Sequence, residues 1–292
     1  MAKEFKKLDE QTKLLSSRGL NISDDKEAQN FLLNNNYYRV SGYSLTLRKH
    51  DKFHPKAKME DIMEIYNFDH EFRHILLKYI GIIEVRIKSV YAYEFSKMYG
   101  PLGYRSGEHF TNYHEHLKIL NKANVQMEKN LSYEACIKHF VEELHEDLPL
   151  WAFVELMTIS DISKLYEITD EDVQKEVVKV FSLRGKKAPE ILVKILHGIV
   201  IVRNLCAHES RLYNRIFITK PSLSSDDKKL LNITKSGKID NSHLFGHVLN
   251  MRRILTVREF ENLKNEINDL CVKYPFVNMK YYGFNPNWYN SI

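Results

Sequence analysis

Three polar residues follow a very apolar stretch and have the types needed for acid–base and phosphate chemistry. Arg203, Asn204 and His208 come directly after the run Ile199 to Val202. A histidine can transfer a proton near neutral pH, and an arginine can stabilise the extra negative charge of a pentacoordinate phosphate. The Asn204 amide can orient either side chain or the phosphate. These three residues are therefore our candidate catalytic set.

The spacing of this set places a condition on its geometry. If the segment from Lys187 to about Ala207 is one helix, Arg203 lies about 140° around it from His208. The two side chains then converge only if the helix ends here, if the Arg203 side chain wraps round the helix, or if two copies of the motif meet across a dimer. Steps of three, four and seven predict a polar stripe on this helix, made up of His197, Asn204, His208 and Arg211.

A structural role is the alternative for the same residues. Asn204 and His208 can be satisfied polar groups of a core, and Arg203 can pair with a buried carboxylate, for which Glu84 is the candidate. Composition alone favours this structural role, since lone histidines near apolar faces are common.

A second pattern has metal-ligand spacing. The run His70-Glu71-Phe72-Arg73-His74 reads H-E-x-x-H, the pattern of zinc metalloproteases, and it falls in a segment with helical periodicity. A third ligand would be needed, which His109, His114 or His116 could supply. The alternative is that both histidines lie on the outer face of a core helix, and we expect no metal and no cofactor in this protein.

Aromatic and basic residues gather near the N-terminus, in the run Tyr37-Tyr38-Arg39-Val40-Ser41-Gly42-Tyr43. Such a cluster can stack nucleic-acid bases and hold phosphate, or it can pack an N-terminal lobe onto the main body. We interpret Tyr37, Tyr38 and Arg39 as candidate RNA-binding residues, and we add Arg86 and Arg211 to them.

The elements that must position these residues are predicted to be helices. Apolar residues recur at helical spacing from Met59 to Met98, as one very long helix or two joined near Gly81, and Arg73, Glu84 and Arg86 interrupt the pattern. No stretch shows the alternation of an extensive sheet. We predict a mainly α fold with Ile82 to Val90 and Ile191 to Cys206 at the centre of one core.

Composition and charge restrict the class of protein that this chain can be. The chain has 292 residues, 43% of them apolar and 28% charged, with a formal charge of +5, which permits an acidic partner such as RNA without requiring one. Cys136, Cys206 and Cys271 lie far apart, so we expect buried thiols and no disulfide framework. A charged N-terminus and the lack of a long apolar run predict a soluble, cytoplasmic protein that does not contact the membrane.

Two parts are predicted from these patterns. Residues 1–57 form a small N-terminal helical lobe that carries the aromatic cluster, and residues 58–292 form the main helical domain. The polar composition of residues 220–241 predicts a mobile loop or an inserted excursion, and the tail with Phe276, Tyr281, Phe284 and Trp288 is too aromatic to be a free end.

The candidate catalytic residues are part of a longer stretch of similarity to a known protein family. Arg203 to His208 has the form R-N-x-x-x-H, which resembles the R-x4-6-H motif of HEPN ribonucleases, and the continuation to Arg215 resembles that of Abi-like abortive-infection proteins (AbiF and AbiD type). The run Tyr37 to Tyr43 resembles the N-Y-Y-R-L-S-G-Y signature of that family. Further matches follow in family order: Tyr66 to Arg73, Ile83 to Arg86, Tyr99 to Pro101, Leu148 to Trp151, Ser160 to Tyr166, and Gly283 to Trp288.

This resemblance implies a HEPN-like helical bundle and a function. The family's activity is metal-independent RNA cleavage by the RNA's own 2′-hydroxyl, with Arg203, Asn204 and His208 in the catalytic positions. One motif per chain implies a homodimer with a composite site. A catalytically silent RNA-binding module of a toxin–antitoxin-like system is the alternative, and zinc proteolysis through His70 and His74 is a minor one. We also expect an RNA or protein antitoxin as a partner.

Overall fold

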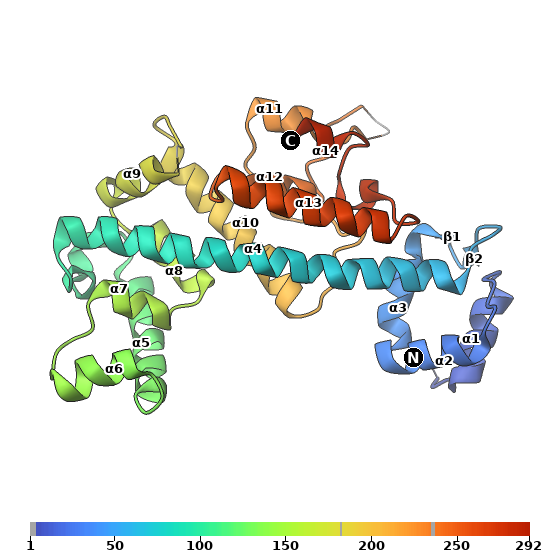
Figure 1. The fold of residues 1–292 in the computed structure, drawn as a ribbon, viewed down its shortest axis with the longest axis horizontal. Coiled ribbons are helices and arrows are strands. Elements are labelled where there is room, and N and C mark those ends of the chain that lie inside the picture. Colours follow the sequence, from blue (N-terminus) through green and yellow to red (C-terminus); the bar gives the residue numbers. More distant parts are fainter. Residues whose placement is uncertain (1–3, 182, 235–236) are drawn as a thin grey trace.

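One long helix forms the axis of the molecule (Figure 1). The computed structural model describes residues 4–181, 183–234 and 237–292, and its longest element is α4 (Met59–Tyr99), with 41 residues. The Asp61 carboxylate accepts a hydrogen bond from the backbone N–H of Lys58 at the start of α4, and Gly100, at φ 76°, ends the helix immediately before Pro101. The sequence predicts either one helix or two helices from Met59 to Met98, and the structure has one.

The other elements are arranged along α4. In Figure 1 the first three helices and a small hairpin lie at one end, α5 to α8 lie at the other, and α10, α12 and α13 run along the middle. The N-terminal elements are α1 (Leu8–Ser17), α2 (Asp25–Asn35), α3 (Tyr37–Tyr43), β1 (Arg48–Lys49) and β2 (Lys52–Phe53). The elements that follow α4 in the chain are α5 (Tyr113–Asn130), α6 (Ala135–Lys138), a π-helical turn (His139–Glu143), α7 (Leu150–Phe153), α8 (Ile159–Ile168), α9 (Glu171–Val180) and α10 (Ala188–Ala207). The last are α11 (Ser225–Lys229), α12 (Phe245–Met251), α13 (Val257–Lys273) and α14 (Trp288–Ser291).

The mainly α prediction is confirmed. Among the described residues the only sheet is the antiparallel pair β1 and β2, with Arg48 opposite Phe53 and Lys49 opposite Lys52. Short 3₁₀ turns connect several helices, at Ser44–Thr46, Gly103–Arg105, Gly107–His109, Val154–Leu156 and Met279–Tyr282. The boundary predicted at residue 57 falls between β2 and α4, and the division into two domains stays a prediction.

The core lies where α4 meets α10, as predicted. Ile83 and Ile87 of α4 and Leu192 and Leu196 of α10 are fully buried. Helices α8, α9 and α12 also pack on α10, and α13 packs on α4. Burial of large aliphatic side chains at about 1.5–3 kcal/mol each is the main source of stability here. Among the described residues, no helix is long and apolar enough to cross a membrane.

Close approach of α12 to α10 depends on a glycine. A Cβ atom placed on Gly198 would lie 2.7 Å from Nδ1 of the buried His247 ring. We therefore expect Gly198→Ala to lower the free energy of unfolding by about 1–2 kcal/mol, because a buried ring must shift, even though alanine favours helices more than glycine does. Urea denaturation monitored by circular dichroism measures the change.

The matched control is Gly81 in the middle of α4, where an added Cβ meets no atom within 4 Å. Gly81→Ala should raise the free energy of unfolding by about 0.5–1 kcal/mol through helix preference alone. Equal effects of the two substitutions would contradict the close packing of α12 on α10.

The polar segment 220–241 is tied to the rest of the chain by several contacts. It contains α11, and the Asp227 side chain in that helix is buried and forms ion pairs with Arg252 and Arg253. Leu231 forms a β-bridge with Phe284 of the tail. Residues 235 and 236 lie outside the described residues.

The aromatic tail packs against the main body, as predicted. Phe284 and Trp288 are buried, and the Phe284 ring lies on Phe245 with centroids 4.1 Å apart. The thiol prediction holds for Cys206, which is fully buried, and burial raises its pKa to about 12. Cys271 is half-buried, with its pKa raised by burial to about 11, and the side chain of Cys136 lies outside the described part of the chain.

Candidate functional site

The candidate catalytic residues lie at the C-terminal end of α10. The helix ends at Ala207, and His208 is its C-cap, with its backbone N–H donating to the Asn204 carbonyl at 3.0 Å. The His208 side chain is exposed, whereas Arg203 and Asn204 are half-buried. The first of the three geometric conditions for convergence, a helix end at this point, is therefore met.

The partner of Arg203 differs from the sequence prediction. Arg203 Nη1 donates to Asn204 Oδ1 at 3.3 Å. Glu84, the predicted supporting carboxylate, instead lies 3.3 Å from the Lys88 ammonium one turn further along α4. Glu84 is therefore not the partner of Arg203, and the structural interpretation of Arg203 loses its predicted carboxylate.

The polar stripe on α10 is confirmed only as far as His208. His197 and His208 are exposed and Asn204 is half-buried, whereas Val202 and Cys206 on other faces are buried. Arg211 does not continue the stripe, because the helix has ended.

Instead, Arg211 packs against α3. A Cβ atom on Gly42 of α3 would lie 3.1 Å from Arg211 Nε, and Arg211 Nη1 donates to the Tyr213 carbonyl. Arg215, on the same segment, donates to the Arg211 carbonyl at 3.3 Å, and burial together with the neighbouring Arg211 charge lowers its pKa.

The turn after His208 is held by an ion pair that the sequence did not predict. Glu209 adopts a left-handed backbone conformation with φ 52°, and its Oε2 accepts hydrogen bonds from Arg73 Nε at 3.0 Å and Nη2 at 2.7 Å. Arg73 is fully buried in α4. Burial would raise the pKa of Glu209, but the hydrogen bonds and charge of Arg73 outweigh it and hold the pKa below its usual range.

Arg73 also joins a buried carboxylate, Asp69, one turn earlier in α4. Arg73 Nη1 donates to Asp69 Oδ2 at 2.5 Å, and both side chains are fully buried. Four further groups donate to Asp69: the hydroxyls of Tyr43 and Tyr282, each at 2.8 Å, and the backbone N–H groups of Leu212 at 3.1 Å and Tyr213 at 2.8 Å. We call Asp69, Arg73 and Glu209 the acidic–basic hub.

The hub connects four parts of the chain that are far apart in sequence. It joins α3, α4, the segment after α10 and the C-terminal tail through hydrogen bonds in a buried environment. Because Glu209 is next to His208, the hub sets where the candidate histidine lies. The only sign of the hub in the sequence is that Arg73 interrupts an apolar helical pattern.

A family model for Abi-like proteins matches residues 30–214. That range is more than half of the chain and contains α3, α4, the hub and the R-N-x-x-x-H motif. The chain belongs to the Abi-like protein family. Membership of this family suggests abortive-infection defence. No curated protein and no solved structure matched the chain.

In this Abi-like protein the H-E-x-x-H histidines lie beside the hub. His70 and His74 are exposed on one face of α4, with ring centroids 4.5 Å apart. His70 Nδ1 lies 3.3 Å from Glu209 Oε2, and His74 Nε2 lies 3.4 Å from Glu209 Oε1. The third potential ligand is therefore Glu209.

The predicted third ligands lie elsewhere. His116 is fully buried and stacks on Phe110, while the His109 ring stacks on Tyr99. Among the described residues, the one His/Cys/Asp/Glu group with metal-ligand spacing is His70, His74 and Glu209.

The acid of the H-E-x-x-H pattern is engaged elsewhere. Glu71 accepts hydrogen bonds from Lys273 at 2.7 Å and from the Tyr274 hydroxyl at 2.5 Å, both on or next to α13. A zinc protease needs this glutamate as general base beside the metal-bound water. The geometry therefore gives no support to zinc proteolysis in this Abi-like protein.

The candidate RNA-binding residues divide into two groups. On α3, Tyr38 is 86% exposed and Tyr37 and Arg39 are half-buried. Tyr37 and Tyr38 line a hollow of about 770 Å³, and Tyr38 and Arg39 line a second hollow of about 400 Å³. The other end of α3 belongs to the core, because Tyr43 is fully buried. The exposed end of this helix is therefore open to a ligand.

Arg86, by contrast, is engaged within the protein. It forms two hydrogen bonds of 2.8 Å with the Glu259 carboxylate and one of 2.9 Å with the Ile254 carbonyl. The hydrogen bonds from Arg86 are the largest cause that lowers the pKa of Glu259 to about 2. Arg86 and Arg211 therefore stabilise contacts between elements of this Abi-like protein.

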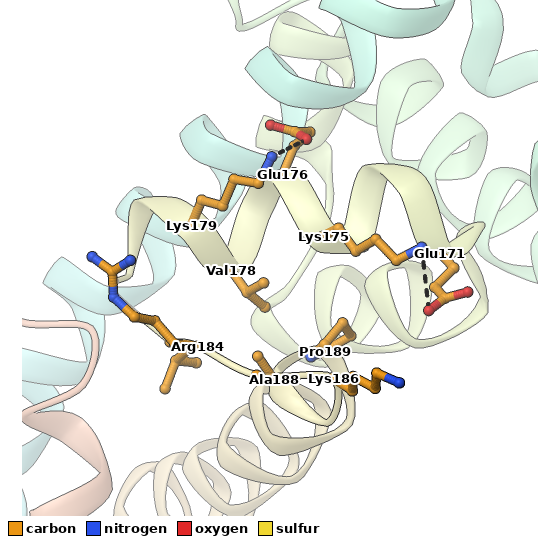
Figure 2. A pocket seen from close by; sticks show the side chains of 11 residues that line it. Glu171, Lys175, Glu176, Val178, Lys179, Arg184, Lys186, Ala188 and Pro189 are labelled. Atoms are coloured by element: carbon orange, nitrogen blue, oxygen red, sulfur yellow. Dashed lines mark hydrogen bonds and ion pairs between the residues drawn. The ribbon is translucent and has the colours of Figure 1, made fainter.

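A separate hollow of about 870 Å³ lies between α9 and the start of α10 (Figure 2). Two of the lysines that line it, Lys175 and Lys179, form ion pairs with Glu171 and Glu176. The helix α10 has 20 residues, so this hollow is about 30 Å along the helix from His208. It is not part of the candidate site.

Proposed function

We propose that this Abi-like protein is a HEPN-type endoribonuclease that acts in abortive-infection defence in the cytoplasm. The observation that carries the proposal is the end of α10, where His208 is exposed on a turn anchored by the hub and Arg203 and Asn204 lie within the preceding turn. A proton-transfer group on an anchored exposed turn, with a cation and an amide beside it, suits phosphodiester chemistry.

The reaction would use the RNA's own nucleophile. A histidine removes the proton from the 2′-hydroxyl, the 2′-oxygen attacks the adjacent phosphorus, and the bond from phosphorus to the 5′-oxygen breaks. A second acid protonates the departing 5′-oxygen. Arg203 stabilises the charge on the pentacoordinate phosphate, and Asn204 holds the Arg203 guanidinium through the hydrogen bond at 3.3 Å.

The proposal includes a homodimer. The chain supplies one R-N-x-x-x-H motif, and the reaction needs a base and an acid on opposite sides of the phosphate. Two motifs that face each other across a dimer supply both. The exposure of His208 leaves its side chain accessible to a second copy.

The decisive experiment incubates the purified protein with labelled single-stranded RNA in the presence of EDTA. We expect cleavage to products with a 2′,3′-cyclic phosphate and a 5′-hydroxyl, and no cleavage of a substrate with 2′-deoxyribose at the cut position. Products with a 5′-phosphate, or inhibition by EDTA, would overturn the mechanism.

The exposed tyrosine on α3 favours a second candidate function, a catalytically silent RNA-binding module. Tyr38 offers a stacking surface, and Arg39 next to it supplies a cation. Such a module would bind RNA with an affinity that falls as salt rises, and it would leave the RNA intact. Intact RNA of several sequences under binding conditions would decide for this function.

An active cytoplasmic ribonuclease harms its host unless something restrains it. We therefore include an RNA or protein antitoxin in the proposal. Co-expression with the neighbouring genetic region, followed by purification, tests whether such a partner copurifies with the chain.

A further inference from the structure

We propose that His70, His74 and Glu209 form a binding site for a transition-metal ion of the Zn²⁺ class. This site goes beyond the proposed function, because the RNA cleavage described above requires no metal. It also differs from the sequence prediction that the chain has no metal ligand. Its ligands come from α4 and from the turn after α10, so a bound ion would connect these two elements.

The three side chains lie close enough together to surround one tetrahedral ion. Zn²⁺ with ligand bonds of about 2.0–2.1 Å places neighbouring ligand atoms about 3.3 Å apart. Each histidine contacts a different oxygen of the Glu209 carboxylate: His70 Nδ1 lies 3.3 Å from Oε2, and His74 Nε2 lies 3.4 Å from Oε1. One ligand atom from each of the three residues lies within 4.8 Å of the others, and the two exposed imidazoles are free of core packing, so side-chain rotation can bring all three residues to one ion.

Each ligand is held in a way that favours binding. His70 and His74 are four residues apart on a 41-residue helix, so their backbones are fixed on one face. Arg73 donates two hydrogen bonds to Glu209 Oε2, which leaves Oε1 directed toward His74. An outer partner that orients a carboxylate ligand in this way is typical of metal sites.

The ligand types select the class of ion. Two imidazoles and one carboxylate suit Zn²⁺, Co²⁺ and related ions, whereas Mg²⁺ and Ca²⁺ take oxygen ligands. Three protein ligands leave a fourth position for water. Since Glu71 is bound by Lys273 and Tyr274, that water has no general base beside it, and the site is structural in character.

Titration of the full-length protein with Co²⁺, after treatment with chelator and dialysis, tests the proposal. Tetrahedral Co²⁺ absorbs strongly in the visible region, so the coordination geometry is read directly, and Zn²⁺ should displace the Co²⁺. We expect one ion per chain and a higher melting temperature with Zn²⁺ than without it.

The variant His74→Ala removes one exposed ligand and leaves the hub intact. Its Zn²⁺ affinity, measured by calorimetry, should fall by more than about 100-fold, the upper end of the loss seen when only an outer partner is removed. The matched control is His139→Ala, because His139 is also exposed and lies 2.7 Å from a carboxylate, Glu143. That pair has no third ligand among the described residues, so its removal should leave Zn²⁺ binding unchanged.

Two outcomes would overturn the site: no saturable binding by the wild-type protein, or equal affinities of wild type and His74→Ala. Neither outcome depends on RNA cleavage, since the measurements are absorption and heat. A failure of the metal site is therefore distinguishable from a failure of the ribonuclease proposal.

Discussion

Replacing His208 with alanine is expected to slow RNA cleavage by about 10²–10⁴-fold, the usual contribution of a general acid or base. The side chain is exposed at the C-cap of α10, so its removal leaves no cavity and the folded state should keep its stability. Arg203→Ala should cost about 10²–10³-fold through loss of charge stabilisation. Single-turnover cleavage of labelled RNA in EDTA gives both rates.

The control for these variants is His197→Ala. His197 is also exposed on α10, but it lies 11 positions before His208, which is about 16 Å along the helix. Its replacement should leave the rate unchanged. Wild-type cleavage by His208→Ala would refute the assignment of the histidine, whatever the result for Arg203.

The proposed composite site can be tested by mixing active and inactive chains. If two copies of the motif form one site, an excess of His208→Ala chains mixed with wild type and allowed to exchange should lower activity well below the wild-type fraction. Activity proportional to the wild-type fraction would show that each chain cleaves alone. Analytical ultracentrifugation of the same mixture supplies the oligomeric state.

The fold and the place of the motif were predictable because both rest on local patterns. Apolar periodicity indicated α4 and α10, and the polar residues at the end of the apolar run indicated where α10 is open to solvent. Arg211 was predicted to lie on the polar stripe because that prediction assumes that the helix continues as far as Arg211. The helix ends earlier, and the chain turns at Glu209, whose backbone conformation is left-handed.

The hub could not be predicted as a whole, because all of its contacts except the Asp69–Arg73 pair within α4 are long-range. Asp69 accepts hydrogen bonds from backbone groups 143 and 144 positions later, and the Tyr282 hydroxyl comes from 213 positions later. No spacing rule covers such distances. For the same reason the H-E-x-x-H pattern showed two ligands on one helix face, whereas the third group, Glu209, is 139 positions from His70.

Replacing Asp69 with asparagine should have the largest effect on stability, a loss of about 3–5 kcal/mol in the free energy of unfolding. The change preserves shape but removes the charge that balances the fully buried Arg73. It also places an NH₂ group among donors, so at least one of the hydroxyl or backbone N–H groups loses its acceptor. Urea denaturation followed by circular dichroism measures the loss, and Asp226→Asn is the control, since that side chain is 89% exposed in its pair with Lys229.

A second variant separates the charge from the hydrogen bonds of the hub. Tyr282→Phe removes one donor to Asp69 and keeps the ring in place, so it should cost about 1–3 kcal/mol, less than Asp69→Asn. If the hub acts as one network, the double variant should be less destabilised than the sum of the single variants by about 0.5–3 kcal/mol, because the two changes break a shared contact. Additive effects, or an Asp69→Asn protein as stable as wild type, would show that the ion pair does not hold the four parts of the chain together. The turn that carries His208 would then depend on the packing of α10 alone.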